Sequence, residues 1–193
     1  MHKNEVNVAF EILLEEIEEV FNILSKEGEE AFRSKDFDKA KQLIEHSERL
    51  RSFREKIKTL QKEWQTIFGG KISTQTKRRT VKSKLKRGLR TPEEKFIMPI
   101  LESILELGGS AQMKDVLKLV QNKMKNILNE YDYKPLSSDP KQKRWENTAQ
   151  WARNSMVNDG LLSSSSPRGI WEITKKGIEF YNQTRLSINI SDK

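Results

Sequence analysis

The stretch KRWENTAQWARNSMVNDGLLSSSSPRGIWEITKKG, residues 143–177, decides the fold of the carboxy-terminal half of this chain. Its first part carries apolar residues at the three- and four-residue spacing of one α-helix face: Trp145, Ala149, Ala152 and Met156. The pair Asp159-Gly160 predicts the end of that helix, because glycine readily adopts the left-handed conformation that follows a last helical turn. The second part predicts two short strands, Leu161-Leu162 and Ile170–Ile173, around the polar turn 163–169. A helix followed by such a hairpin is the DNA-reading end of a winged helix-turn-helix.

The order and spacing of several motifs in this region also resemble a known family. They are Trp151-Ala152, Asp159-Gly160-Leu161-Leu162, Gly169-x-Trp171 and Ile173-Thr174-x-x-Gly177. The region from about Thr91 to Gln183 resembles the winged-helix domain at the N-terminus of Mrr-type restriction proteins. In that family the domain binds DNA and precedes a separate nuclease domain. The chain stops where that nuclease would begin, so the resemblance implies DNA binding, and the catalytic role of the family is not implied.

The net charge of +8 is unevenly distributed along the 193 residues. Residues 69–90 hold nine basic residues and no acidic one, whereas the blocks before and after carry net charges of −3 and +2. The chain has no cysteine, which excludes a disulfide framework and is compatible with the cytoplasm, where we expect the protein to associate with the nucleoid. No stretch approaches the roughly 20 apolar residues of a membrane span, so we expect no membrane association.

Residues 1–68 predict a coiled-coil-like helical hairpin. A first apolar stripe runs from Phe10 to Leu24, and Gly28 followed by Ser34-Lys35-Asp36 marks a break, with Asp36 as helix cap. The second stripe has the seven-residue spacing of a coiled-coil seam at Leu43, Leu50, Ile57 and Trp64. A second helix of about 30 residues spans about 45 Å and is longer than a first helix of about 20 residues, which cannot cover all of it. This mismatch favours a homodimer through residues 1–68; a monomeric hairpin with an overhanging end is the alternative.

Residues 69–90 predict a basic arm that contacts DNA phosphates or the minor groove and gains order on binding. The alternatives are a solvated linker and attraction to an anionic membrane, although no amphipathic apolar face accompanies the run. The arm residues that we assign to DNA are Lys77, Arg78, Arg79, Lys82, Lys84, Lys86 and Arg87.

Residues 91–186 predict the winged-helix domain, and 187–193 a frayed tail. Thr91 with Pro92 reads as a helix start, Pro99 as a bend or restart, and Gly108-Gly109-Ser110 as a turn before a helix that opens at Ala111. Residues 131–140 form a long connection to the third helix, and Lys175 to Leu186 close the domain. The expected fold class is therefore mainly α, with a helical hairpin and an α+β winged helix-turn-helix.

The polar face of the helix at 144–158 carries side chains that suit groove edges. We expect base contacts from Arg144, Asn147 and Gln150, phosphate contacts from Lys141, Lys143 and Arg153, and further polar contacts from Thr148 and Asn154. In the wing we expect contacts from Ser164, Ser165, Ser166 and Arg168. A merely solvated face is the alternative. Trp151 and Trp171 suit core packing better than stacking on unpaired bases.

Catalytic motifs are scarce. His2 and His46 have no triad or metal-site companions, and Glu93-Glu94-Lys95 suits a helix first turn better than a nuclease site. We therefore expect no enzyme, no cofactor and no metal. Three functions stay open: a dimeric transcriptional regulator that reads double-stranded DNA, a DNA-targeting or sensing subunit of a restriction-like anti-phage system that recruits an effector protein, and a protein-interaction module.

Overall fold

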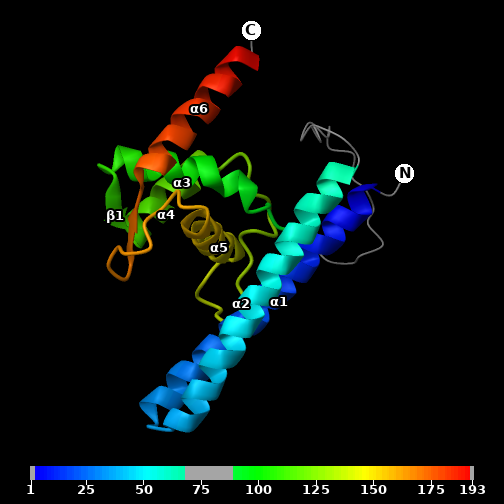
Figure 1. Cartoon of the computed structure of the whole chain (residues 1–193), viewed down its shortest axis with the longest axis vertical. Coiled ribbons are helices and arrows are strands. Elements are labelled where there is room, and N and C mark those ends of the chain that lie inside the picture. Colours follow the sequence, from blue (N-terminus) through cyan, green and yellow to red (C-terminus); the bar gives the residue numbers. More distant parts are fainter. Residues whose placement is uncertain (1–2, 68–88, 192–193) are drawn as a thin grey trace. The chain divides into compact units, whose positions relative to one another are not determined.

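The computed structural model describes residues 3–67 and 89–191, and its chain divides into two compact units (Figure 1). One unit is built on helices α1 and α2, and the other contains the remaining helices and strands. The predicted fold class is confirmed: the chain is mainly α, with an N-terminal helical hairpin and a winged-helix-like C-terminal part. None of the helices within the described residues is both long and apolar enough to cross a membrane.

The first unit is an antiparallel hairpin of two helices of equal length. Helix α1 (Lys3–Arg33) and helix α2 (Phe37–Ile67) each span 31 residues. The expected break at Gly28 is wrong, because packing of α1 on α2 outweighs the roughly 1 kcal/mol cost of a helical glycine. The turn is at 34–36: Lys35 has a φ of 62°, and Asp36 Oδ1 caps α2 by accepting a bond from Lys39 N at 3.1 Å. The length mismatch that favoured a homodimer therefore does not exist.

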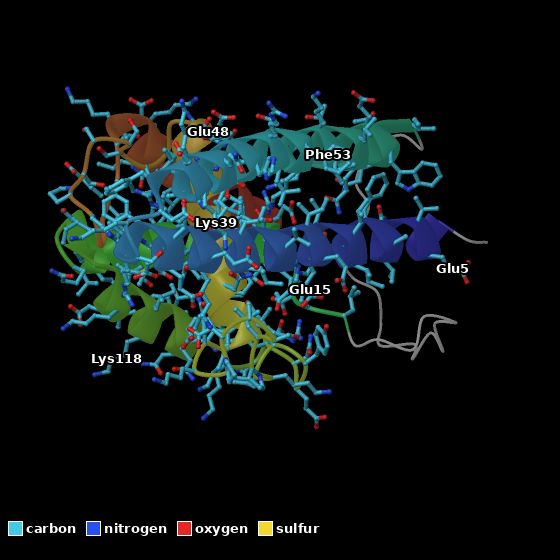
Figure 2. All side chains as sticks on the ribbon, turned by 90° about the horizontal axis from the view of Figure 1, so that it is seen from below. Glu5, Glu15, Lys39, Glu48, Phe53 and Lys118 are labelled. Atoms are coloured by element: carbon cyan, nitrogen blue, oxygen red, sulfur yellow. The ribbon has the colours of Figure 1, made fainter. Side chains whose placement is uncertain are left out.

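The two helices meet along a heptad seam, and Figure 2 shows them running side by side with their side chains as sticks. Of the predicted seam residues of α2, Leu43 and Ile57 are buried and Leu50 and Trp64 are half-buried. Ile57 and Leu50 pack with Leu14 and Ile17 of α1. The predicted seam is confirmed as the contact between α1 and α2.

Beside this seam lies a polar ladder that connects α1 to α2. Arg54 donates from Nε and Nη2 to Glu18 Oε1 at 2.9 and 2.6 Å, and both side chains are fully buried. One heptad along, Gln61 Nε2 donates to Glu11 Oε1 at 2.8 Å. Because both steps are seven residues, the ladder sets the register of the antiparallel pair.

The second unit has the element order of a winged helix. It contains α3 (Glu94–Glu106), β1 (Ser110–Gln112), α4 (Met113–Lys123), α5 (Arg144–Asn158), β2 (Ile170–Glu172) and α6 (Lys175–Ser191). Strands β1 and β2 pair antiparallel with Ala111 opposite Trp171, and a single bridge joins Leu162 to Ile173. The predicted strand at Leu161-Leu162 is therefore present only as this single bridge.

Several local expectations for this unit are corrected. Residues 110–112 form strand β1 rather than a turn and a helix start, because they pair with β2. Helix α3 continues through Pro99 without a restart. The Thr91 hydroxyl does not cap α3 but donates to Asp132 Oδ2 at 2.6 Å, and the helix begins at Glu94. Helix α6 extends to Ser191, so part of the expected tail is helical.

The core of this unit collects side chains from all its helices and from both sides of the wing. Phe96, Ile100, Val116, Met156 and Trp171 are among its buried members. Trp151 is buried as well, at 4% exposure. Both tryptophans therefore pack inside the protein, as expected, and are not displayed for stacking on bases.

Lys123 links the end of α4 to α3. We expect the loss of its proton at high pH to lower the stability of this unit. Its Nζ lies 2.7 Å from Glu106 Oε1 and 3.0 Å from Glu102 Oε2. Burial lowers the pKa of Lys123, but the hydrogen bonds and charges of Glu106 and Glu102 outweigh it, so the pKa lies above its ordinary 10.5. A raised folded-state pKa gives stability that is complete below the unfolded value and is lost as pH rises through the folded value.

We therefore expect Lys123→Met to cost up to about 1 kcal/mol of unfolding free energy at pH 8, and to cost less at a pH above the ordinary lysine value of 10.5. Urea unfolding followed by tryptophan fluorescence at both pH values measures this. Lys125→Met, at an exposed position close by, is the control and should change little. A cost that is the same at both pH values would contradict the assignment.

Candidate nucleic-acid interface

The start of α5 is held in place by the connection that precedes it. Glu146 Oε2 accepts a hydrogen bond from Lys143 N at 3.1 Å, so this acid caps the helix rather than opposing a ligand. The backbone oxygens of Lys134 and Asp132 accept bonds from Arg144 N and Trp145 N, each at 3.0 Å. The connection therefore sets where the first turn of α5 lies.

Asp132 anchors that connection to the start of the domain. Its side chain is fully buried, and its carboxylate accepts bonds from Thr91 N at 2.8 Å, Thr91 Oγ1 at 2.6 Å and Asn129 N at 2.9 Å. A buried carboxylate is retained at low cost only when its oxygens are satisfied in this way. Sequence reasoning missed Asp132 because its partners come from segments about forty residues apart.

Two tyrosines of the connection support cations at the start of α5. The Arg144 guanidinium carbon lies 4.8 Å from the Tyr131 ring centre, and Lys134 Nζ lies 5.6 Å from the same ring. Lys143 Nζ lies 5.7 Å from the ring of Tyr133. Such cation–π contacts hold charge without neutralising it. Sequence reasoning treated these residues as a featureless connection, although the spacing Tyr-x-Tyr-Lys was visible.

The predicted site residues of α5 differ in exposure. Lys141, before the helix, and Lys143 are exposed, and four others are half-buried: Arg144, Gln150, Arg153 and Asn154. Asn147 and Thr148 are buried, at 5% and 1% exposure, so their expected outward orientation is wrong. The buried sector of α5 is therefore wider than its apolar stripe. Its polar side chains are satisfied there, since Thr148 Oγ1 donates to Arg144 O at 3.1 Å and Ser155 Oγ donates to Glu93 Oε2 at 3.0 Å.

Arg153 is a cation without a carboxylate partner in the part of the chain that the structure describes. Its Nε is buried and makes no hydrogen bond there, and Nη1 only reaches Asn154 Oδ1 at 3.5 Å. Burial lowers the pKa of Arg153 from its ordinary value, which remains far above neutral pH. A cation that no described carboxylate neutralises suits an anionic ligand such as a phosphate.

The wing presents a short polar turn. Ser164, Ser165 and Arg168 are exposed, whereas Ser166 is half-buried and its hydroxyl donates to Ile170 O at 3.1 Å. Ser163 Oγ and Ser165 Oγ lie 3.1 Å apart. The turn is thus stiffened by its own serines, and Arg168 is the cation that it exposes.

The predicted DNA-binding residues of the basic arm, Lys77 to Arg87, lie outside the described residues. Glu93, considered above as part of a nuclease motif, is buried. Its Oε1 lies 3.8 Å from Arg90 Nη2, and its Oε2 accepts the hydrogen bond from Ser155 Oγ. These contacts give it a structural role. No cluster of three or more potential metal-ligating His, Asp or Glu side chains is found among residues 3–67 and 89–191.

The element order and the wing define a winged-helix-like domain, and cations gather at the start of its helix α5. Residues 94–183 match the model of a family described as the Mrr N-terminal domain. This confirms the resemblance drawn from the sequence motifs. Neither a curated protein nor a solved structure gives a significant match.

Proposed function

We propose that this chain is a non-catalytic protein that binds double-stranded DNA through α5, the wing and the basic arm, and that it acts as a homodimer through residues 1–68. The observation that carries the proposal is the match of residues 94–183 to the Mrr N-terminal domain. The match coincides with a winged helix whose α5 begins among four cations, Lys134, Lys141, Lys143 and Arg144.

The chemistry of that helix start suits phosphate. A helix N-terminus carries a partial positive charge, and the cations around the start of α5 add to its attraction for an anion. Lys141, Lys143 and Arg153 are the phosphate ligands of the proposal, and Arg144 and Gln150 are the candidates for base edges. Asn147 is withdrawn from the base-reading set because it is buried.

The Mrr-type match favours a DNA-targeting or sensing subunit of a restriction-like defence system, with the hairpin available to recruit an effector protein. A dimeric transcriptional regulator is the second candidate, favoured by the exposed apolar face of the hairpin described below. Both roles place the protein with the nucleoid in the cytoplasm. Gel shifts over genomic fragments separate them: one strong palindromic site supports regulation, and sequence-tolerant or modification-dependent binding supports targeting.

The triple variant Lys141→Gln, Lys143→Gln, Arg153→Gln tests the interface on α5. We expect weaker binding to a mixed-sequence duplex by about 10- to 100-fold, and a plot of log K against log salt that is shallower by about 2–3, since each lost phosphate contact removes about 0.9. Fluorescence anisotropy across a salt series measures both quantities.

A charge-matched control removes three other exposed cations of the same domain: Lys95→Gln, Lys175→Gln, Arg185→Gln. It should change binding far less. Replacing the basic residues from Lys77 to Arg87 by Gln should independently flatten the salt dependence. If the wild-type chain bound no duplex even at low salt, the DNA proposal would be rejected and the interaction module would remain.

A further inference from the structure

The helical hairpin displays a second apolar seam that neither of its own helices covers. It consists of Leu13 and Val20 on α1 and Phe53, Leu60 and Ile67 on α2, and these five side chains are 41–68% exposed. Val6, one heptad before Leu13, is half-buried. We call this set the outer seam.

The outer seam has the spacing of a coiled coil. On α2 its members are seven residues apart, and each follows a residue of the α1-facing seam by three: Leu50, Ile57 and Trp64. On α1, Leu13 and Val20 stand in the same relation to Phe10 and Ile17. Over this part of the hairpin, both helices therefore carry apolar a and d positions, of which the a positions face the partner helix and the d positions form the outer seam. The outer seam ends where the same heptad position holds Glu27 on α1 and His46 on α2.

The register of the hairpin places the members of the outer seam in pairs. Glu11 bonds Gln61 and Glu18 bonds Arg54, so Leu13 lies level with Leu60, and Val20 lies level with Phe53. Because both helices turn their d positions to the same side, the outer seam is one continuous strip along the hairpin. This arrangement is half of a four-helix bundle, in which the a and d positions of four helices share one core.

We propose that a second copy of this chain covers the outer seam and completes an antiparallel four-helix bundle. The occupant must supply two helices of the same length with the same heptad and register, and the hairpin itself meets this requirement. A two-fold axis parallel to the helices sets α1 of one copy against α2 of the other, so that Leu13 meets Leu60 of the partner subunit.

The exposed area is large enough for such an interface. Five large apolar residues of roughly 200 Å² each, about half exposed, leave about 500 Å² of apolar surface on each copy. Joining two copies buries about 1,000 Å² from these residues alone, which reaches the lower bound for a specific interface. A single exposed strip of this size on a monomer already lies at the upper end of the usual range.

The inference deepens the proposed homodimer by naming its surface, and it rests on the hairpin alone rather than on the DNA interface. Sedimentation equilibrium of the full chain at micromolar concentration tests it. We expect wild type at twice the chain mass of 22.6 kDa. Leu60→Glu should raise the dimer dissociation constant by at least about 100-fold, because it places a charge in the centre of the buried strip.

Ile44→Glu is the matched control. Ile44 is 58% exposed on the same helix, but it follows the buried Leu43 directly and so lies on the side of α2 away from the outer seam. It should leave the dissociation constant unchanged. Helical circular dichroism checks that each variant folds, and Val20→Glu on α1 replaces Leu60→Glu if the latter loses its helix signal.

A monomeric wild-type chain overturns the inference, and so does a seam variant that dimerises like wild type. Gel shifts on the same samples keep the two proposals apart. A wild-type monomer that still binds duplex DNA rejects the outer seam as a dimer surface and leaves the proposed DNA interface intact. A dimer that binds no DNA supports the outer seam and rejects the DNA interface.

Discussion

Replacing Arg54 by methionine is expected to lower the free energy of unfolding of the helical hairpin by about 3–5 kcal/mol, because it removes the guanidinium that compensates the fully buried carboxylate of Glu18. Both side chains of the pair are fully buried, and the guanidinium makes two hydrogen bonds to the same oxygen. Far-UV circular dichroism during urea unfolding measures the loss.

Glu18 and Arg54 allow a double-mutant cycle. The double variant Glu18→Met, Arg54→Met should recover stability to within about 1 kcal/mol of wild type, because replacing both charges by apolar side chains removes the desolvation cost together with the attraction. If the double variant were as unstable as Arg54→Met alone, the buried charge would not be the cause.

The hairpin contains its own control for burial. Arg33 Nη2 lies 2.6 Å from Glu29 Oε1, the same separation as in the buried pair, but the two side chains are 74% and 63% exposed. Arg33→Met should cost less than about 0.5 kcal/mol, as for other exposed pairs one helical turn apart. Equal losses at Arg33 and Arg54 would show that burial does not decide the outcome.

Gly177→Ala is expected to destabilise the winged-helix unit by about 3 kcal/mol, as overpacking of a rigid site does. A Cβ at Gly177 would fall well inside contact distance of the Leu161 carbonyl oxygen and would lie 2.8 Å from Ile173 Cγ1. Thr174 holds the start of α6 close to the segment that begins the wing. Its hydroxyl donates to Gly160 O at 2.7 Å and accepts a hydrogen bond from Gly177 N at 3.0 Å. Backbone on one side and a packed side chain on the other leave little room for relaxation.

Tryptophan fluorescence reports mainly on this unit, since three of the four tryptophans, Trp145, Trp151 and Trp171, belong to it, and Trp64 lies in the hairpin. Gly28→Ala is the opposite-sign control: its Cβ would meet Leu43 Cβ at an ordinary 3.8 Å inside α1, five residues before the helix ends at Arg33. That substitution should stabilise the hairpin by about 0.5–1 kcal/mol, because alanine loses less conformational freedom than glycine in a helix. A Gly177→Ala protein as stable as wild type would disprove the close approach of α6 to the wing.

Local patterns in the sequence predicted much of the fold. The heptad at Leu43, Leu50 and Ile57 identified the seam between α1 and α2, because a seven-residue spacing repeats on one helix face whatever surrounds it. Glycine chemistry predicted the end of α5 and the wing turn: Gly160 and Gly169 have φ values of 74° and 83°. The motif Ile173-Thr174-x-x-Gly177 was visible as a pattern, and the structure supplies its steric reason.

Only the tertiary structure decided which surfaces meet, because that depends on contacts between residues far apart in the chain. Strand β1 exists through its pairing with β2, and α1 crosses Gly28 because α2 supports it along its whole length. The burial of Asn147 and Thr148 likewise depends on what packs against α5, which their polar side chains do not indicate. The register of α1 against α2 decides two further features. It pairs Glu18 with Arg54, and it leaves the outer seam exposed.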